Sequence, residues 1–534
     1  MATASGGMKR GPLRSASERM YPWTELIDGE HPGCRRPYPQ DNTEQSERYR
    51  KTALGEKKKP HKTLLLAGET GAGKTTLINV MINYLLGVKR EDQVWFEITD
   101  DESDRTSAES QTSIITVYGF YLQESPVHLT LIDTPGYGDT RGIDHDKEIA
   151  MSLCSLSKSA EDIEINAVCL VIKAAENRLS DRQVYIFDAV QSLFGRDKAE
   201  NIVLLITHSF GVLHRNALMA VKEAKVKCAV NDKNQPVFFL FDNCQSEPAD
   251  EEDGEEYGDR DQMLDHSWNR SMRGMAGFFN FFDSINPKPL KMTRDVLQQR
   301  KQLEAQMSNL KEQVEMIELK QEELKQNQAA LEQNKEYVKT NKNFEYEVDV
   351  LYKERADIDP AVAKEATCCS VCEENCHYPE CWWVRDLSWC SVMREKHCKV
   401  CTNRCHYSKH VKEAKIYITK TRTEKRTYED LKKEYDGKIG DGVSLVKKLE
   451  EELHELEKKK LKLVMDAFYY VEKLEMIALN TDALITLQHI DFIIKKLKEI
   501  QEPEKADVLE GIKKRAGTEK QGALGYVSKH FLKK

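Results

Sequence analysis

The sequence has no long hydrophobic run, since none of its apolar stretches approaches the ~18 residues that a membrane-spanning helix needs. The first twenty residues lack the apolar core of a secretion signal, and neither end carries a lipidation motif. A net charge of −9, from 80 basic and 89 acidic residues, gives no overall attraction to nucleic acid or to an anionic membrane. We therefore expect a cytoplasmic protein with no membrane span and no nucleic-acid partner.

The 534 residues are enough for roughly two to four domains. Charged residues make up 32% of the chain, which favours long exposed helices. Of the 14 cysteines, nine fall between Cys368 and Cys405. Without a secretion signal, such clustering indicates metal binding rather than disulfide bonds.

Residues 68–75 read GETGAGKT and fit the phosphate-binding pattern G-x-x-x-x-G-K-[ST]. An apolar strand-like run precedes them at 62–67, and a helical run follows at 76–86. Glycines let backbone N–H groups turn toward an anion, and the helix N-terminus adds its positive dipole end. We expect Lys74 to reach the outer phosphates and the Thr75 hydroxyl to bind Mg²⁺. The predicted nucleotide contacts are Gly68, Glu69, Thr70, Gly71, Ala72, Gly73, Lys74, Thr75 and Thr76.

A second motif, DTPG at 133–136, follows the buried strand pattern of 127–134. Asp133 at the strand end is expected to hold Mg²⁺ through water, and the Gly136 N–H to meet a γ-phosphate. Between the two motifs, Thr112 lies where a polar stretch meets the strand 114–122, and it is our candidate for a further threonine on Mg²⁺. Thr106 and Thr116 remain alternatives for this role.

Residues 61–290 alternate strand and helix patterns. This order predicts an α/β fold: a three-layer P-loop NTPase domain with a mainly parallel sheet and ligands at the carboxyl ends of its strands. Asp133, His208 and Asn243 all follow strand ends, so they are expected to converge on one crevice with the phosphate loop. Residues 1–60 are predicted to be disordered.

Two helical segments follow. In 293–348, apolar residues recur every seven positions from Val296 to Val338, which predicts a coiled coil. A single helix packed on the first domain is the alternative, because the companion seam is incomplete. A second such segment covers 425–500, and residues 501–534 are predicted to be weakly ordered. We expect the two segments to form an antiparallel hairpin with the cysteine cluster at its tip.

The cluster, residues 365–412, contains a repeat. The pattern C-x2-C-x3-C-H-x3-C starting at Cys369 recurs as C-x2-C-x3-C-H-x3-H starting at Cys398. Paired cysteines followed by a further Cys or His suit tetrahedral Zn²⁺. We expect one or two structural zinc ions, and favour two; catalytic zinc and free thiols are the alternatives. The candidate ligands are Cys369, Cys372, Cys376, His377, Cys381, Cys390, Cys398, Cys401, Cys405 and His410.

The runs GETGAGKTTLIN (68–79) and DTPGYGD (133–139) resemble the septin-like branch of P-loop GTPases, which includes septins, the immunity-associated GTPases and the plastid import-receptor GTPases. The resemblance covers roughly residues 61–285. It implies GTP or GDP and Mg²⁺ as ligands, switching by nucleotide state, and homodimerisation through this domain. The coiled-coil and cysteine regions match no family that we can name.

Two departures from that branch matter. The expected guanine-reading motif Asn/Thr-Lys-x-Asp reads Thr207-His208-Ser209-Phe210 here, without the Asp. Some septin-like members carry Thr-His at this place, so His208 and the late Asn243 are expected to contact the base. In Ras-like enzymes a Gln after the DxxG motif orients water. Tyr137 stands there instead, so intrinsic hydrolysis should be slow.

The sequence therefore predicts a slow or dimerisation-activated GTPase switch with a zinc-tipped coiled-coil arm for an unidentified protein partner. Lys74, Thr112 and Gly136 would stabilise the transferring phosphate. One alternative is a nucleotide-binding scaffold with little or no turnover, in which the arm is the working part. A weaker alternative is an ATPase.

Overall fold

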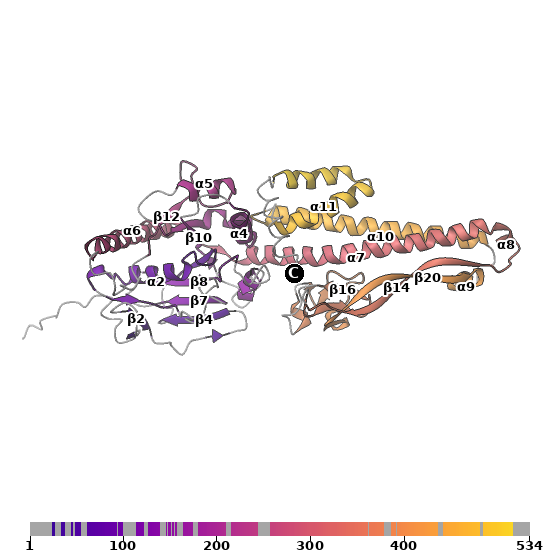
Figure 1. Cartoon of the computed structure of the whole chain (residues 1–534), viewed down its shortest axis with the longest axis horizontal. Helices are drawn as coiled ribbons and strands as arrows, with labels where there is room; N and C mark the ends of the chain where they lie inside the picture. Colours follow the sequence, from indigo (N-terminus) through magenta and orange to yellow (C-terminus); the bar gives the residue numbers. More distant parts are fainter. Residues whose placement is uncertain are drawn as a thin grey trace, which may run out of the picture. The chain divides into compact units, whose positions relative to one another are not determined.

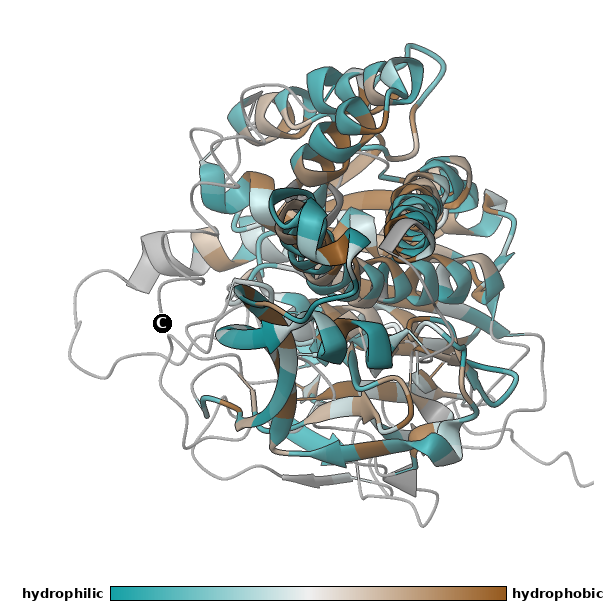
Figure 2. Ribbon diagram, turned by 90° about the vertical axis from the view of Figure 1, so that its right-hand side faces the viewer, coloured by the Kyte–Doolittle hydropathy of each residue, from teal (hydrophilic) through white to brown (hydrophobic). Residues whose placement is uncertain are grey.

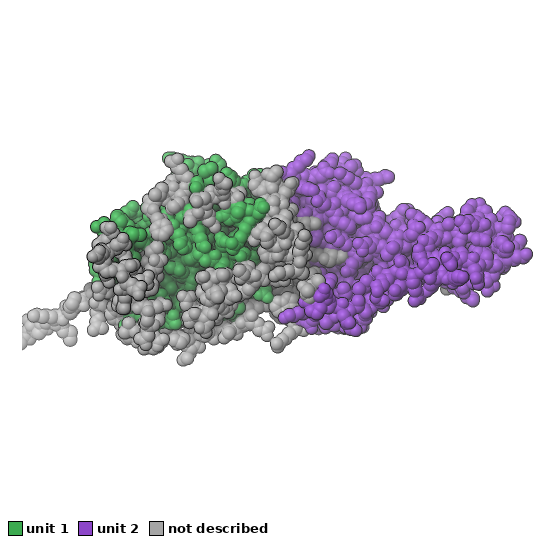
Figure 3. Space-filling model, in the orientation of Figure 1, with its two compact units in different colours: residues 1–297, 477–484, 517–533 green, residues 298–476, 485–516, 534 purple. Residues whose placement is uncertain are grey.

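The computed structural model describes residues 24–26, 34–37, 44–45, 49–54, 61–92, 94–99, 114–121, 127–138, 146, 148–150, 152–153, 155–156, 164–174, 180–209, 215–243, 257–360, 363–378, 386–390, 392–435, 442–480 and 484–515. The chain forms two compact units, coloured separately in Figure 3. Unit 1 contains residues 1–297, 477–484 and 517–533, and unit 2 contains 298–476, 485–516 and 534. The chain thus leaves unit 1 and returns to it.

Unit 1 is built on an eight-stranded sheet, with the order β12-β11-β10-β5-β8-β7-β4-β3. The pairs β12–β11, β11–β10, β10–β5 and β5–β8 are parallel, whereas β7 is antiparallel to β8. The predicted mainly parallel sheet is confirmed. The bounds of its strands are β3 Glu44–Gln45, β4 Tyr49–Leu54, β5 His61–Gly68, β7 Ile115–Phe120, β8 His128–Asp133, β10 Ala167–Lys173, β11 Ile202–Thr207 and β12 Phe238–Leu240.

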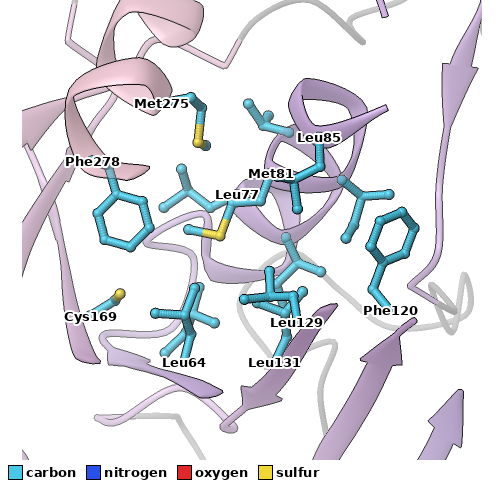
Figure 4. Close-up of a cluster of buried hydrophobic side chains, with 14 of the residues drawn as sticks. Leu64, Leu77, Met81, Leu85, Phe120, Leu129, Leu131, Cys169, Met275 and Phe278 are labelled. Carbon is cyan, nitrogen blue, oxygen red and sulfur yellow. The ribbon is translucent and has the colours of Figure 1, made fainter. Parts of the chain in front are cut away.

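Helices cover both faces of this sheet, as the three-layer prediction requires. On one face, α2 (Lys74–Leu85) and α6 (Tyr257–Ser284) share a buried cluster with the strands, drawn in Figure 4. Leu64 of β5 belongs to this cluster, whereas the equally buried Leu65 alternates to the other face. There α4 (Asp181–Ser192) packs against β5. Other elements of unit 1 include α5 Arg215–Glu223, β9 Glu164–Ile165 and β13 Lys288–Pro289.

The periodicity of α2 explains how this helix is held. Leu77, Met81 and Leu85 recur every four residues and so lie on one face of the helix. All three are buried, and Figure 4 shows them pointing toward Leu64 and Leu131. Each such side chain contributes about 1.5–3 kcal/mol when fully buried. The core therefore fixes the helix whose N-terminus follows the phosphate loop.

The prediction of disorder over residues 1–60 is wrong where the structure describes them. β1 (Thr24–Leu26) pairs with β2 (Cys34–Pro37), and β2 pairs with β6 (Trp95–Phe96). β4 extends the main sheet by pairing in parallel with β7. Composition alone did not reveal these short strands, because β2 and β4 each pair with a strand much farther along the chain, β6 and β7.

Unit 2 contains long helices, and Figure 2 shows hydrophobic residues interspersed among hydrophilic ones along them. α7 (Lys291–Gln333) packs against α10 (Gly442–Ile477) in the antiparallel sense, because Leu331 clusters with Leu445 while Glu318 bonds Lys460 at 2.7 Å. The predicted heptad residues of α7 are buried from Val296 to Leu331. The two helical segments therefore pair within one chain.

The prediction that the cysteine cluster lies at the tip of a helical hairpin is wrong. After α7 and the short α8 (Lys335–Lys339), the chain enters β14 (Glu345–Asp357), which pairs along its whole length with β20 (Lys415–Thr427). Residues 345–348, assigned to the coiled coil from sequence, are in this strand. The two-stranded ribbon runs back along α7, as Figure 1 shows, since Tyr346 bonds Asn327 while Asn375 bonds Glu312.

The cysteine-rich module therefore lies beside the middle of α7 and not at the end of a helical hairpin. Its short strands are β15 Ala366–Cys369, β16 Glu374–His377, β17 Met393–Arg394, β18 His397–Cys398 and β19 His410–Glu413. Asn309 and Gln313 of α7 donate hydrogen bonds to Val400 O at 3.0 Å and to the Glu374 carboxylate at 2.8 Å. These two bonds attach the module to α7.

The C-terminal part of unit 2 is also helical. α9 (Tyr428–Glu434) precedes α10, and α11 (Leu484–Glu499) follows it. A further helix covers 503–515, with Ala506, Leu509 and Ile512 buried. The prediction of weak order for 501–534 is thus wrong over 503–515, and residues 516–534 lie outside the described residues. Among the described helices, none combines the length and apolarity needed to cross a membrane.

Candidate functional site

The phosphate loop joins β5 to α2 in the conformation that the motif requires. Gly73, the N-cap of α2, has φ of 80°, which lies in the left-handed region that favours glycine. At the other side of the loop, Thr207 at the end of β11 donates a hydrogen bond from Oγ1 to Ala72 O at 2.8 Å. The loop is therefore shaped by its own glycines and fixed by a neighbouring strand end.

Lys74 is buried at the start of α2, and its ammonium group lies inside the loop. Its Nζ donates hydrogen bonds to Gly68 O at 3.2 Å and to Glu69 O at 3.0 Å. Burial lowers the pKa of Lys74 to about 8, against the opposing attraction of Asp133 and Glu69. A cation held this way inside a glycine loop is suited to meeting phosphate oxygens.

The expected Mg²⁺ ligands come together. Asp133 ends β8, which pairs in parallel with β5, so its carboxylate lies at the level of the loop. Thr75 Oγ1 donates a hydrogen bond to Asp133 Oδ2 at 3.1 Å. A hydroxyl beside a buried carboxylate is a donor set of hard oxygens that fits Mg²⁺. The structure thus places Thr75 and Asp133 where the sequence predicted.

The DTPG segment is held directly against the phosphate loop. Thr70 N donates to Tyr137 O at 3.1 Å, and Tyr137 N donates to Gly68 O at 3.0 Å. A Cβ on Gly136 would lie 2.6 Å from Thr70 N, so only glycine allows this approach. The Tyr137 side chain is buried, and burial raises its pKa well above the usual value.

Two cationic side chains at the loop were missed from sequence. Lys173, the last residue of β10, places Nζ 3.4 Å from the position that a Cβ on Gly71 would take. Arg182, in the first turn of α4, forms an ion pair with Glu69 at 2.9 Å and donates to Gly138 O at 2.9 Å. A charged residue ending an apolar strand was the available signal for Lys173. Arg182 follows Ser180, which is the N-cap of α4 and forms a capping box with Gln183.

The residues predicted to contact a base follow β11 and β12. His208 has φ of 53° and lies beside the loop, with Cε1 3.8 Å from the position of a Gly73 Cβ. Asn243 accepts a hydrogen bond at Oδ1 from Ser271 of α6 at 3.0 Å. Its Nδ2 is buried and has no hydrogen-bond partner among the described residues. Asn243 thus keeps a donor available for a ligand.

The threonine predicted between the two motifs cannot be placed, because Thr112 and its alternative Thr106 lie outside the described residues. Thr116, the other alternative, is in β7 and pairs in register with Asp133. It is buried, and its hydroxyl lies 3.5 Å from Ile114 O.

This geometry agrees with comparisons to known proteins. Residues 58–152 match the family model described as Septin. Over 80 residues the chain is 42% identical to Septin-1 of Mus musculus and 38% identical to Septin-1 of Homo sapiens. Within residues 58–152 the chain is therefore similar to septins. The matched stretch is 15% of this chain and spans 19% of either relative.

The resemblance drawn from GETGAGKTTLIN and DTPGYGD is therefore confirmed for the septin-type domain. Among solved structures, Toc33 from Arabidopsis thaliana in complex with Mg²⁺ and GMPPNP is 13% identical, with a TM-score of 0.28. That match covers 42% of this chain and 87% of the other.

The cysteine-rich module in unit 2 forms a second candidate site. Its side chains make two groups, in each of which the ligand atoms lie within 4.8 Å of one another. The first group is Cys369, Cys372, Cys401 and Cys405, and the second is Cys376, Cys398, Cys401 and His410. Thiolates with a single imidazole are the donor set of structural zinc sites. Seven of the ten predicted ligands are thus brought together.

Two other predicted ligands, His377 and Cys390, are not in these groups. His377 Nδ1 lies 3.1 Å from Cys390 Sγ, so those two side chains contact each other. Cys381 is outside the described residues. The two halves of the sequence repeat also do not each enclose a site, because both groups combine ligands from both halves. The spacing of the cysteines in the sequence identified the ligands. Which ligands come together in one group depends on β15 lying between β16 and β19.

Proposed function

We propose that this chain is a guanine-nucleotide-binding protein that acts as a slow or dimerisation-activated GTPase switch. The observation that carries the proposal is the meeting of Thr75 and Asp133 at 3.1 Å beside the glycine loop of the septin-type domain. Those two side chains would hold Mg²⁺, and Lys74 would neutralise charge on the outer phosphates. Bound Mg²⁺ would supply charge neutralisation during phosphoryl transfer.

The preference for guanine is proposed from Asn243 and His208. An amide that holds its Oδ1 in a protein hydrogen bond and leaves a buried Nδ2 available can donate to a base carbonyl. His208 lies next to the start of α2, where its ring can stack on a base. Together they would replace the Asp of the usual guanine-reading motif.

Slow turnover is proposed from Tyr137. This side chain occupies the place of a water-orienting residue, yet it is buried and its backbone is bonded to the phosphate loop. It therefore presents no group that could orient water there. A second copy of the chain could supply the missing group, which is why we propose activation by dimerisation.

The working arm of this switch would be unit 2. Structural zinc in its cysteine-rich module would hold a small polar segment together and keep the ribbon of β14 and β20 fixed on α7. An arm stabilised in this way presents a constant surface to a protein partner. The chain connections between the units, among them those at 297–298 and 476–477, would transmit changes of nucleotide state.

The test is titration of the full chain with fluorescent GTP and ATP analogues, with and without Mg²⁺. We expect binding that depends on Mg²⁺ and prefers guanine, lost in Lys74→Ala and weakened for GTP alone in Asn243→Ala. Gly511→Ala, far in sequence from the site, is the control for general damage. Equal affinity for both analogues would contradict the proposed preference for guanine. No binding of either analogue would contradict the proposal that the chain binds nucleotides.

A second candidate function is a nucleotide-binding scaffold with little or no turnover. The buried Tyr137 side chain favours it, because hydrolysis needs an oriented water. Phosphate release measured over a range of protein concentrations separates the two. Hydrolysis that rises with concentration supports the switch, whereas turnover equal to that of buffer at every concentration supports the scaffold.

A further inference from the structure

Cys401 belongs to both groups of metal-ligand side chains in the module. We propose that the module binds two zinc ions that share the Cys401 thiolate as a bridging ligand, in one binuclear centre. Cys369, Cys372 and Cys405 would complete the first ion's shell, and Cys376, Cys398 and His410 the second. This inference rests on the proposed structural zinc and specifies how that zinc is bound.

The spacing of sulfur atoms already fits a metal shell. A tetrahedral ion with Zn–S bonds of about 2.3 Å has S–S edges of about 3.8 Å. Cys372 Sγ and Cys405 Sγ, one from each half of the sequence repeat, lie 3.8 Å apart. Neither residue is near the other in sequence, so this contact is a product of the fold. The first site is therefore arranged as an ion would require.

Backbone N–H groups point at the sulfur atoms in the way that stabilises thiolates. Cys398 Sγ accepts hydrogen bonds from Val400 N at 3.3 Å and from Cys401 N at 3.4 Å. Cys369 Sγ accepts from Cys372 N at 3.4 Å. Cys401 Sγ accepts from Cys405 N at 3.2 Å. These bonds offset the negative charge that several thiolates place in one small volume.

His410 is oriented as a metal ligand. Its Nδ1 lies 3.2 Å from His406 O, so a proton on Nδ1 is held by a backbone carbonyl. That bond leaves Nε2 as the coordinating atom. A metal-bound histidine usually donates its other ring N–H to a carboxylate or a backbone carbonyl in this way. His410 is only 5% exposed, and its Nε2 has no hydrogen-bond partner among the described residues. A bound ion would satisfy this buried nitrogen.

Sharing follows from the number of ligands. Two separate tetrahedral ions need eight protein ligands, whereas the described residues bring seven together. Of the remaining cysteines in the described module, Cys390 contacts His377, and Cys368 lies 3.3 Å from Asn375 Oδ1. One bridging thiolate gives both ions four ligands.

The shared residue lies in a loop that is hydrogen-bonded on both sides of it. Val400 O, next to Cys401, accepts a hydrogen bond from Asn309 of α7. Thr402, on the other side, donates its N–H to the buried Glu374 carboxylate at 2.9 Å. Gln313 of α7 also donates to Thr402 Oγ1 at 3.2 Å. The bridging position is therefore fixed to α7 from both sides, independently of the metal.

The experiment uses the full chain, expressed with zinc or loaded with cobalt(II). In the wild type we expect about two zinc ions per chain. Cobalt should give an electron paramagnetic resonance signal that grows with the first equivalent and falls with the second, because a bridging thiolate couples the two spins. Cys401→Ser should lose both zinc ions. Cys405→Ser and His410→Ala should each lose about one, and Cys390→Ser, the matched control, should lose none.

Each other outcome decides against the proposal in a different way. A cobalt signal that doubles with the second equivalent would mean two isolated ions. Loss of one ion in Cys381→Ser, with only one lost in Cys401→Ser, would mean that Cys381 completes a separate site. About one zinc ion in the wild type would mean that Cys401 serves a single site. No metal at all would instead remove the proposed structural zinc itself, while leaving the nucleotide-binding proposal intact.

Discussion

Asn480 donates a hydrogen bond to Asp188 across 2.7 Å, although 292 positions separate the two residues. Both side chains are buried within unit 1. Two backbone contacts reinforce the pair, since Leu479 N donates to Phe194 O at 3.0 Å and Leu479 O accepts from Lys227 Nζ at 2.6 Å. The segment that returns after α10 is thus fastened to α4, the helix whose first turn contacts the phosphate loop through Arg182.

Replacing Asn480 by alanine should destabilise unit 1 by about 1–3 kcal/mol, because it removes a bond to a buried carboxylate. The unfolding free energy from denaturant titration of the full chain measures this change. Met476→Ala is the control, since Met476 is 62% exposed and lies four positions away. Equal stability of the two variants would show that the Asn480–Asp188 contact does not hold the segment in place.

Nucleotide binding should take up a proton above pH 8. Burial lowers the pKa of Lys74 to about 8, and phosphate oxygens would favour its charged form. Affinity should then fall as the pH rises beyond 8, by up to about tenfold per pH unit. Calorimetry in buffers of different ionisation enthalpy at pH 8.5 measures the uptake, and pH 6.5 is the internal control. Proton release, or the same uptake at both pH values, would contradict the assignment to Lys74.

Gly136→Ala should weaken Mg²⁺-dependent nucleotide binding by about tenfold or more, or about 1.4 kcal/mol. Its added Cβ would lie 2.6 Å from Thr70 N, and the backbone there has no room to move away while both Tyr137 bonds remain. Gly511→Ala is the matched control, because nothing lies within 4 Å of a Cβ at Gly511. Unchanged affinity in Gly136→Ala would mean that this close approach is not needed for binding.

Tyr137→Phe should leave any hydrolysis unchanged and keep or slightly raise stability. The Tyr137 hydroxyl is buried with no hydrogen-bond partner among the described residues, so its removal relieves a desolvation cost of about 1–3 kcal/mol. Single-turnover phosphate release and thermal unfolding measure both effects. A marked loss of hydrolysis at equal stability would assign the phenol a catalytic role that its burial argues against.

Unit 2 should lose stability as the pH rises from about 4.5 to 7. Burial raises the pKa of Glu312 to about 7, against the opposing hydrogen bond from Asn375. Because the folded state then binds more protons than the unfolded state, ionisation above pH 4.5 costs roughly 1–3 kcal/mol. Glu312→Gln should remove this slope and be the more stable form at pH 8. Parallel pH profiles for zinc-loaded wild type and variant would refute the assignment.

The phosphate-binding half of the site could be predicted from sequence because its chemistry is local. The glycine loop, Lys74 and Thr75 lie in one stretch of eight residues, and Asp133 ends an apolar strand that must lie beside the loop in a parallel sheet. The buried face of α7 could also be predicted from the sequence, since a seven-residue period of apolar residues specifies one face of a helix.

The features that could not be predicted depend on pairings far along the chain. Arg182 reaches Glu69 only because α4 packs against β5. The Cys369 and Cys398 halves interleave because β15 lies between β16 and β19, a strand order that spacing does not encode. The ribbon of β14 and β20 replaced the expected helical turn because 13 residues on each strand pair without a break.

The return of the chain at 477–484 means that the nucleotide-binding unit is not a contiguous piece of sequence. Unit 2 is, for most of its length, an insertion within unit 1, entered after residue 297 and left before residue 477. A truncation that stops near residue 290 would expose the buried side of α4 that Asn480 covers. A minimal nucleotide-binding protein would instead delete the insertion and join residues 297 and 477 through a flexible linker.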